Sequence, residues 1–213
     1  MSAAEELEIG HCIFYKSMLS YHIGFRILCV VTLEVGRGMK KVGTERLWLR
    51  DFEERDSEPF FEFLSDRECC YLDGGYEPVS SKNDPFFKKC MKLFRLQREE
   101  RFMIELKAEG RCIGTIHIMD VDNRQVEARE IGYAVCPSYQ NQGYATEAVR
   151  EAVKYCFEEL GVEMVTAKAI TPNQASIRVL EKLGFIREGF RRKGAKYPPV
   201  GVVDYVCYYL ERT

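Results

Sequence analysis

One amphipathic segment predicts the most regular element of the fold. Its apolar residues recur at intervals of three and four, the spacing of one face of an α-helix, over about four turns. They are Ala145, Ala148, Val149, Ala152, Val153, Cys156, Phe157 and Leu160. Gly161 follows, and glycine often ends a helix because it adopts a left-handed backbone without steric cost. The sequence therefore predicts a helix over residues 145–160 that packs one face against a core.

The segments around this helix predict a sheet. Several stretches alternate apolar and polar residues or form short apolar runs between turn signals. The predicted strands are Arg46–Arg50, Arg101–Lys107, Cys112–Val121, Val126–Val135, Met164–Thr171, and two that surround Gly189–Arg191 and Asp204–Leu210. Further helices are predicted within Asp51–Leu64, Pro85–Arg98 and Asn173–Leu183. This order, in one unit that begins near Thr44, predicts an α+β fold.

The composition limits what such a domain binds. The 213 residues include 31 basic and 33 acidic ones, and the formal net charge of −2 provides no field that attracts nucleic acid or an anionic membrane. Nine cysteines form no C-x-x-C pair, and the three histidines are scattered, so we expect no metal. We expect a cytoplasmic protein in which free thiols act as small apolar side chains.

The N-terminal segment 1–38 fits poorly with the rest of the chain. Its apolar run Ile23–Leu33 is interrupted by Arg26 and is shorter than a membrane span. Met39-Lys40-Lys41 resembles a translation start. We therefore interpret 1–38 either as an extension that packs on the domain or as sequence upstream of the true start, and 39–213 as the domain.

A short loop precedes the long helix and predicts an anion site. It reads Gln140-Asn141-Gln142-Gly143-Tyr144-Ala145. The first amides of a helix have no partner within it, and the helix dipole places partial positive charge there. Gly143 lets the backbone approach a phosphate closely. The loop therefore predicts a diphosphate site that requires no lysine.

Three motifs in this order resemble the GNAT N-acetyltransferase superfamily, most closely its RimJ/RimL-like branch, which acetylates ribosomal-protein N-termini. They are Glu130-Ile131-Gly132-Tyr133, the loop Gln140–Ala145, and Asn173-Gln174-Ala175-Ser176 followed by Leu180-Glu181-Lys182-Leu183-Gly184-Phe185. The resemblance covers Thr44 to Thr213. It implies a mixed, mostly antiparallel twisted sheet flanked by about four helices.

The resemblance also implies acetyl-CoA as co-substrate. The amides of Gln142–Ala145 would bind the CoA pyrophosphate, and the edge of Tyr133–Val135 would pair with the pantetheine amides as an added strand does. Asn173 would hydrogen-bond the cofactor arm. The expected cofactor contacts are Tyr133, Ala134, Val135, Gln140, Asn141, Gln142, Gly143, Tyr144, Ala145, Thr146, Asn173 and Ser176.

Two residues are candidates for catalysis. Strand alternation places Glu130 on one face with Ala128, Gly132 and Ala134, where small side chains leave room for a substrate. Glu130 is therefore the candidate base, although it could instead form an ion pair with Arg129 or a neighbouring strand, or a water chain could be the base. Ser176 is the candidate donor to the departing thiolate, or an ordinary residue of a first helical turn.

Two further features bear on the chemistry. Many family members carry a tyrosine where this chain has Leu180, so the usual general acid is in doubt. A strand N–H near Ala134 or Val135 would stabilise the oxyanion.

The acceptor is a primary amine, and the sequence leaves its kind open. Deprotonating an α-amine at neutral pH costs about 1 kcal/mol, whereas a lysine or polyamine amine costs about 4.6 kcal/mol. A site with few catalytic groups therefore favours a protein N-terminus, with a polyamine or other small amine as the alternative. A sensor that binds acyl-CoA without turnover and an interaction scaffold with a vestigial loop are alternatives of another kind. A homodimer is also open.

The remaining candidates have a structural interpretation as well as a functional one. The basic stretch Arg191-Arg192-Lys193 with Lys196 is either a solvated face or a contact for an acidic peptide or the CoA 3′-phosphate. We interpret His117, the segment Phe86–Phe94 and Cys136 as packing residues.

Overall fold

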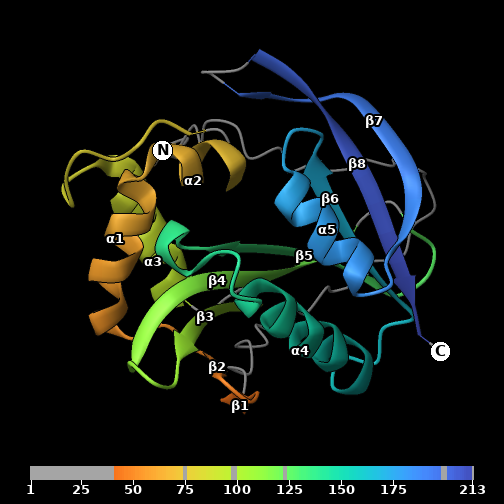
Figure 1. The fold of residues 1–213 in the computed structure, drawn as a ribbon, viewed down its shortest axis with the longest axis horizontal. Coiled ribbons are helices and arrows are strands. Elements are labelled where there is room, and N and C mark those ends of the chain that lie inside the picture. Colours follow the sequence, from red (N-terminus) through yellow and green to blue (C-terminus); the bar gives the residue numbers. More distant parts are fainter. Residues whose placement is uncertain (1–40, 74–75, 97–99, 122–123, 198–200, 213) are drawn as a thin grey trace, which may run out of the picture. The chain divides into compact units, whose positions relative to one another are not determined.

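One eight-stranded sheet organises the part of the chain that the structure describes. The computed structural model describes residues 41–212 except 74–75, 97–99, 122–123 and 198–200, so the extension 1–38 lies outside it. The strands are β1 (Val42–Gly43), β2 (Leu47–Arg50), β3 (Glu100–Leu106), β4 (Arg111–Asp120), β5 (Ala128–Val135), β6 (Met164–Ile170), β7 (Ile186–Tyr197) and β8 (Gly201–Glu211). Their order is β1-β2-β3-β4-β5-β6-β8-β7. All neighbours are antiparallel except β5 and β6, which are parallel (Figure 1).

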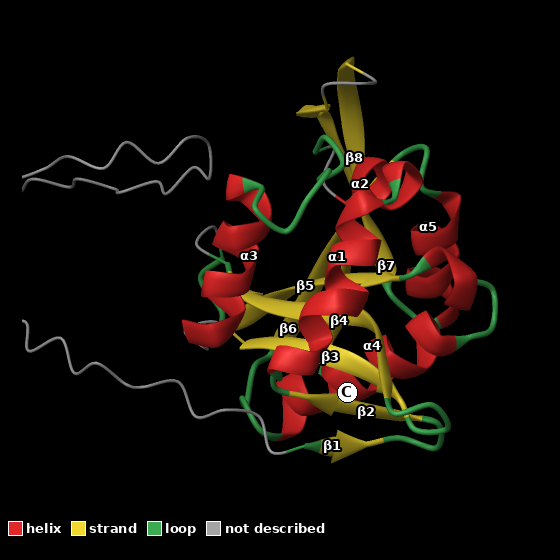
Figure 2. Ribbon diagram, turned by 90° about the vertical axis from the view of Figure 1, so that its left-hand side faces the viewer, coloured by secondary structure: helices red, strands yellow, loops and turns green. Residues whose placement is uncertain are grey.

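Helices cover both faces of this sheet. Among the described residues they are α1 (Ser57–Ser65), α2 (Arg67–Asp73), α3 (Pro85–Leu96), α4 (Tyr144–Glu158) and α5 (Gln174–Lys182). The helices α4 and α5 share one apolar cluster with the sheet. The helices α1, α2 and α3 contribute to a separate cluster on the other face (Figure 2). The expected α+β fold with a mixed, mostly antiparallel sheet is confirmed, and the described residues form five helices where about four were expected.

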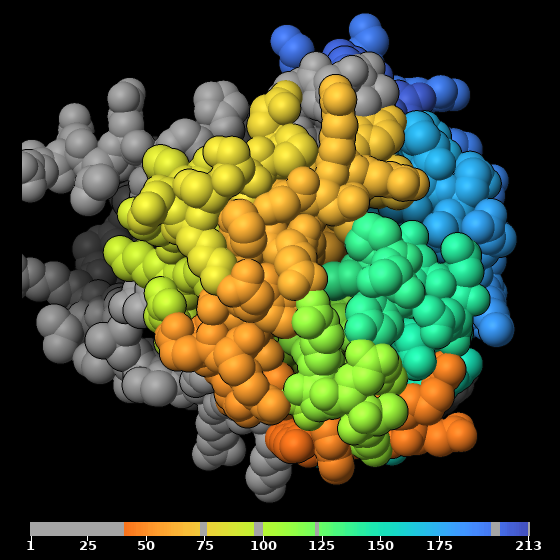
Figure 3. All heavy atoms as spheres, turned by 60° about the vertical axis from the view of Figure 1, so that its left-hand side comes forward, coloured from red at the N-terminus to blue at the C-terminus, as the bar shows by residue number. Residues whose placement is uncertain are grey.

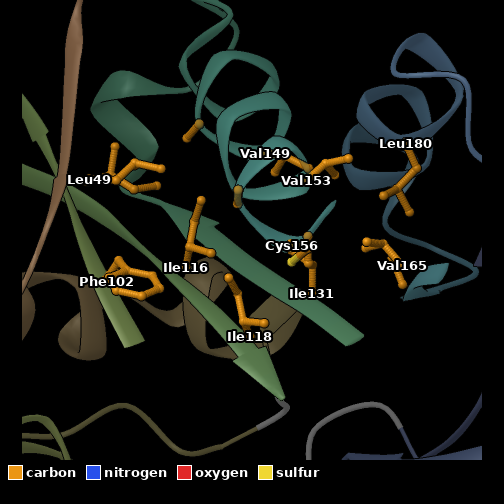
Figure 4. Packing of buried hydrophobic residues seen from close by; sticks show 14 of the residues in the cluster. Leu49, Phe102, Ile116, Ile118, Ile131, Val149, Val153, Cys156, Val165 and Leu180 are labelled. Atoms are coloured by element: carbon orange, nitrogen blue, oxygen red, sulfur yellow. The ribbon is translucent and has the colours of Figure 1, made fainter. Parts of the chain in front are cut away.

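The cluster around α4 is the main core. Val149 and Cys156 on α4 are fully buried and face Ile116 of β4 and Ile131 of β5, while Leu180 of α5 closes the far end (Figure 4). The periodicity of the sequence predicted this face correctly. Apolar burial of this kind contributes about 25 cal/mol per Å², so the core holds α4 firmly against the middle of the sheet.

The strands β5 and β6 stay paired over only a short stretch. Their register comprises Ala128↔Met164, Arg129↔Val165 and Glu130↔Thr166, and no pair follows. On its other side β5 pairs with β4 along its whole length, as far as Val135. The second half of β5 therefore has an edge that β6 does not cover.

The alternation of a strand identifies which groups face this edge. The amide of Cys136 donates to the carbonyl of Ile113 on β4 at 2.8 Å. Residues two apart on a strand direct their N–H and C=O groups to the same side, so the backbone of Ala134 also faces β4. Tyr133 and Val135 direct theirs to the open edge.

Buried charges join β2 to β3 and to the start of α1. Arg50 of β2 bonds the carboxylates of Asp56 and Glu105 at 2.7 Å each, and the three side chains are 4%, 2% and 6% exposed. Arg55, which is half-exposed, reaches the same Glu105 oxygen at 2.7 Å. Burial acts against the charged form of Arg50, but these carboxylates raise its pKa. The network fixes the entry into α1.

Some elements differ from the prediction. The stretch Asp51–Leu64 divides into a 3₁₀ turn (Glu54–Asp56) and α1. The helix α2 was not predicted, because its seven residues are too few to show a helical period. The strands β7 and β8 run well beyond the predicted segments and form a long two-stranded ribbon (Figure 1).

The described residues have three further properties, which concern disulfides, metal-binding clusters and membrane-spanning helices. The seven cysteines among the described residues are free thiols, and four of them are buried. No group of three or more His, Cys, Asp or Glu side chains that could hold a metal occurs in the described segments. No helix there is long and apolar enough to cross a membrane.

The buried charges generate a prediction about stability. Arg50→Met would leave Asp56 in the interior without its cation, so unfolding should become easier by about 3–5 kcal/mol. The control Arg111→Met removes an exposed ion pair with Glu62 and should cost about 1 kcal/mol or less. Urea denaturation measures both. Equal losses in the two variants would contradict the structural role of the buried network.

Candidate active site

The loop before α4 presents backbone amides without acceptors. Gly143 is the N-cap residue, with φ +83°, and Asn141 also has a positive φ of 58°. The first bond into the helix runs from the amide of Glu147 to the carbonyl of Gly143 at 3.0 Å. Within the described residues the amides of Gln142 to Thr146 donate no hydrogen bond. They are available to an anion at the positive end of α4.

Side chains brace this loop from three directions. Arg46, which directly precedes β2, donates to the carbonyl of Gln142 at 3.0 Å and to Glu147 of α4 at 2.7 Å. The side chain of Gln140 donates to the carbonyl of Val135, and that of Gln142 donates to Ser138. The predicted loop residues therefore have two roles, because their side chains hold the conformation while their amides stay open.

Glu147 is the centre of the Arg46 brace. Burial disfavours its charged form, but hydrogen bonds from the Thr44 hydroxyl and from the amide and guanidinium of Arg46 lower its pKa. Glu147 therefore remains ionised at neutral pH and fixes the first turn of α4 to the start of β2.

A cavity of about 360 Å³ opens beside these amides. Its wall includes residues of the end of β5, the loop, α4, α5, α1 and α2. Figure 3 shows residues of α1 and α2 (orange to gold) next to the region where α4 begins (green). The predicted cofactor contacts that line it are Tyr133, Ala134, Val135, Gln140, Asn141, Gly143, Tyr144, Ala145, Thr146, Asn173 and Ser176. Of the predicted contacts only Gln142 is not part of the lining.

One face of α5 lines the same cavity and was missed in the sequence. It consists of Ala175, Arg178, Val179 and Lys182, which follow one another at helical spacing from the Asn173 cap. Arg178 and Lys182 add positive charge at the wall opposite the loop. The sequence could have predicted this face of α5, because the position of the Asn173 cap and the helical period together determine which residues share it.

Two hydroxyl groups, of Tyr133 and Ser176, belong to residues that line the cavity. The Tyr133 hydroxyl is 2.9 Å from the Ser176 hydroxyl and 3.2 Å from the Ser176 carbonyl. Burial raises the pKa of Tyr133 to about 12, although the bond with Ser176 acts the other way, so the phenol is protonated at neutral pH. Asn173 caps α5 by accepting from the Ser176 amide at 3.0 Å, as predicted. Its amide nitrogen donates to none of the described residues and can donate to another acceptor.

A second, smaller cavity adjoins the first. Both share Leu72, Tyr133, Asn173 and Ser176 in their walls, and the second also contains Glu130. Glu130 forms an ion pair with Lys168 of β6 at 2.9 Å. This is the neighbouring-strand pair that the sequence left open, with a partner that it did not name. Glu130 and Ser176 thus lie in the wall of one cavity.

The other candidates occupy structural positions. Cys136 packs in the cluster of α1, α2 and α3, and burial raises the pKa of its thiol to about 11. Leu180, at the position of the family tyrosine, is fully buried in the core. Arg192 pairs with Asp204 at 2.7 Å on the β7–β8 ribbon.

The comparisons agree with this arrangement. The family description "Acetyltransferase (GNAT) domain" matches residues 46–186. A relative is the uncharacterized N-acetyltransferase YnaD of Bacillus subtilis, 32% identical over 71% of this chain and 86% of that protein. Another is the putative ribosomal N-acetyltransferase YdaF of B. subtilis, 30% identical over 70% of this chain and 83% of that protein.

Solved structures share the fold. A GNAT-family acetyltransferase from Bacillus anthracis is 29% identical, has a TM-score of 0.68 and covers 81% of this chain and 98% of its own. Spermidine N-acetyltransferase from Vibrio cholerae, solved with CoA and spermine, is 21% identical with a TM-score of 0.66, and covers 79% of this chain and 96% of its own. The chain belongs to the GNAT acetyltransferase family and is an N-acetyltransferase, as its motifs predicted.

The position of His117 generates a prediction about pH. Burial, with a smaller effect of the Arg101 charge, lowers the pKa of His117 to about 3, while an unfolded histidine has a pKa of about 6.5. The unfolded chain therefore binds a proton that the folded chain does not, and stability falls as the pH decreases below about 6.5.

Between about pH 7.5 and pH 5.5 this loss should reach about 1.4 kcal/mol. His117→Gln should remove this part of the pH dependence in urea denaturation. A variant that keeps the full pH dependence would show that folding does not lower the pKa of His117.

Proposed function

We propose that this enzyme transfers the acetyl group of acetyl-CoA to the α-amine of a protein N-terminus. The observation that carries the proposal is the row of unpaired amides at the start of α4, open to a cavity that leads to Ser176 and Glu130. An anion is the ligand that such amides favour. The backbone edge at Tyr133 and Val135 continues the same wall.

The described residues fit acetyl-CoA along its length. The amides of Gln142–Ala145 bind the diphosphate, and Arg178 and Lys182 add charge for the phosphates. The open edge of β5 pairs with the pantetheine amides, and the free amide nitrogen of Asn173 donates to the same arm. When bound, acetyl-CoA supplies the acetyl group as a thioester.

Glu130 accepts the proton of the acceptor amine. Its Oε2 atom contacts Lys168, and its Oε1 atom forms no hydrogen bond or ion pair with any described residue. Oε1 is therefore the oxygen that meets the amine. A base in this position is worth about a hundredfold or more in rate.

The chain also supplies groups that stabilise the negative charge on the thioester oxygen and on the departing sulfur. The N–H groups of Tyr133 and Val135 face the open edge of β5, whereas the N–H of Ala134 faces β4. Tyr133 is nearer to Glu130 along the strand, so its N–H stabilises the negative charge that develops on the thioester oxygen. The Ser176 hydroxyl donates to the departing sulfur, and the Tyr133 hydroxyl holds it in place.

The choice of acceptor rests on the small number of groups in the site that can remove a proton from an amine. Among the described residues, Glu130 is the only carboxylate that lines the second cavity. An α-amine needs about 1 kcal/mol to lose its proton at neutral pH, and a polyamine amine needs about 4.6 kcal/mol. A single carboxylate that also pairs with a lysine suits the α-amine, so a polyamine is the second candidate.

Gly143→Val tests the cofactor site. A side chain at φ +83° is strained and lies where a phosphate would approach, so calorimetry should show acetyl-CoA affinity reduced at least tenfold. Gly161→Val is the matched control, because Gly161 also has a positive φ but lies after α4, away from the cavity. The control should bind normally. Unchanged affinity in Gly143→Val would show that the loop is not the diphosphate site.

Thiol release from acetyl-CoA, measured with peptides, polyamines and aminoglycosides, tests the reaction. We expect turnover with peptides that carry a free α-amine and none when that amine is blocked. Tight acetyl-CoA binding without thiol release from any amine would indicate a sensor instead.

Glu130→Gln should reduce kcat by about a hundredfold or more at neutral pH and leave the affinity for acetyl-CoA intact, because it removes the base but not the cofactor site. The rate of the variant should recover partly as the pH rises and the amine loses its proton unaided. An unaltered rate at neutral pH would remove Glu130 from the mechanism and favour a water chain.

A further inference from the structure

The second cavity contains a balanced pair of charges. Its volume is about 160 Å³, and among the residues that line it only Glu130 and Lys168 carry a charge. Their side chains are 22% and 27% exposed and project from the adjacent strands β5 and β6. Leu72, Ile170 and Tyr205 form apolar walls around them. A half-buried ion pair in a substrate cavity indicates a ligand that carries charges of both signs.

We propose that Lys168 is the specificity-determining residue of this enzyme and binds a carboxylate next to the acceptor amine. The acceptor is then an α-amine with a carboxylate a few bonds away, either the acidic side chain of a residue at a peptide N-terminus or the carboxylate of a free amino acid. This inference rests on the proposed function, because it assumes that Glu130 receives the amine.

The physical basis is an exchange of partners. In the free enzyme Glu130 and Lys168 neutralise each other at 2.9 Å. When a ligand with both charges enters, its ammonium group contacts Glu130 and its carboxylate contacts Lys168. Glu130 and Lys168 therefore each have a partner of opposite charge before and after the ligand binds. Binding does not carry the free-energy cost of leaving a partly buried charge without a partner.

A polyamine cannot make this exchange. Its amine would contact Glu130, so that Lys168 would share one carboxylate with a second cation in a cavity partly shielded from water. Like charges in such a position cost affinity and act against the wrong ligand. Lys168 therefore selects against polycations as well as for carboxylates.

A second cation extends the positive side of this subsite. Arg191 of β7 is opposite Tyr205 of β8 in the strand register. Residues directly opposite on antiparallel strands project to the same face, so Arg191 emerges on the face of the Tyr205 ring, which lines the cavity. Arg191 is exposed and forms no ion pair with the described residues. It is available to an acidic residue further along a peptide.

The proposal is tested by comparing kcat/KM for acceptors that differ in whether they carry a carboxylate near the amine. Thiol release is measured with a peptide that has Asp or Glu at its first two positions, with the same peptide carrying Asn or Gln, with free aspartate, and with spermidine. The wild-type kcat/KM should be at least tenfold higher for the acidic peptide than for the amide peptide. Lys168→Gln should bring this ratio near one and raise the rate with spermidine, while calorimetry shows unchanged acetyl-CoA affinity.

Two further variants define the controls. Lys168→Arg keeps the charge and should keep the preference for the acidic peptide. Lys154→Gln removes a lysine that pairs with Glu158 on the exposed side of α4 and should behave as wild type.

The possible failures are distinguishable. Equal rates for acidic and amide peptides in the wild type would overturn the role of Lys168 and leave the proposed function standing. Acetylation of aspartate but of no peptide would support the carboxylate subsite and overturn the protein acceptor. Absence of turnover with every acceptor would overturn both.

Discussion

The site depends on backbone groups that form no backbone hydrogen bond with the described residues. β5 and β6 part after Glu130, and α4 begins at Gly143 without a side chain that caps its amides. Polar backbone groups in such positions must bond water or a ligand, because leaving them unpaired is costly. The gap between the strands and the start of the helix open into one cavity. The binding site is therefore an interruption of the hydrogen bonding that builds the rest of the sheet.

Such an interruption persists only if the elements around it are held apart by other contacts. The core around Val149 and Ile131 holds α4 against β5, and Arg46 ties the loop to both β2 and Glu147. On the far side, the Tyr133–Ser176 hydrogen bond joins β5 to the start of α5. These contacts leave the amides free while they fix their direction, which is the preorganisation that a charged ligand needs.

The sequence predicted the features that local patterns encode, such as helical periods and helix caps. It missed contacts between residues that are far apart in the chain. The period of three and four identified α4, and Asn173 identified the start of α5, because both signals are local. Lys168 was missed as the partner of Glu130, since it lies on a strand nearly forty residues later and nothing local links the two. Arg178 and Lys182 could have been found from the helical period. The positive backbone angle at Asn141 has no sequence signal as strong as a glycine.

The two cavities share Leu72, Tyr133, Asn173 and Ser176, but different groups dominate the rest of their walls. In the proposed function the diphosphate is bound by backbone amides of the loop, and the side chains of Arg46, Gln140 and Gln142 hold that loop in its conformation. The acceptor cavity instead depends on the side chains of β5, β6 and α2. A change of one charge at Lys168 would alter which amines fit without disturbing the amides that bind the diphosphate. Selectivity can therefore change while the acetyl-donor site stays the same.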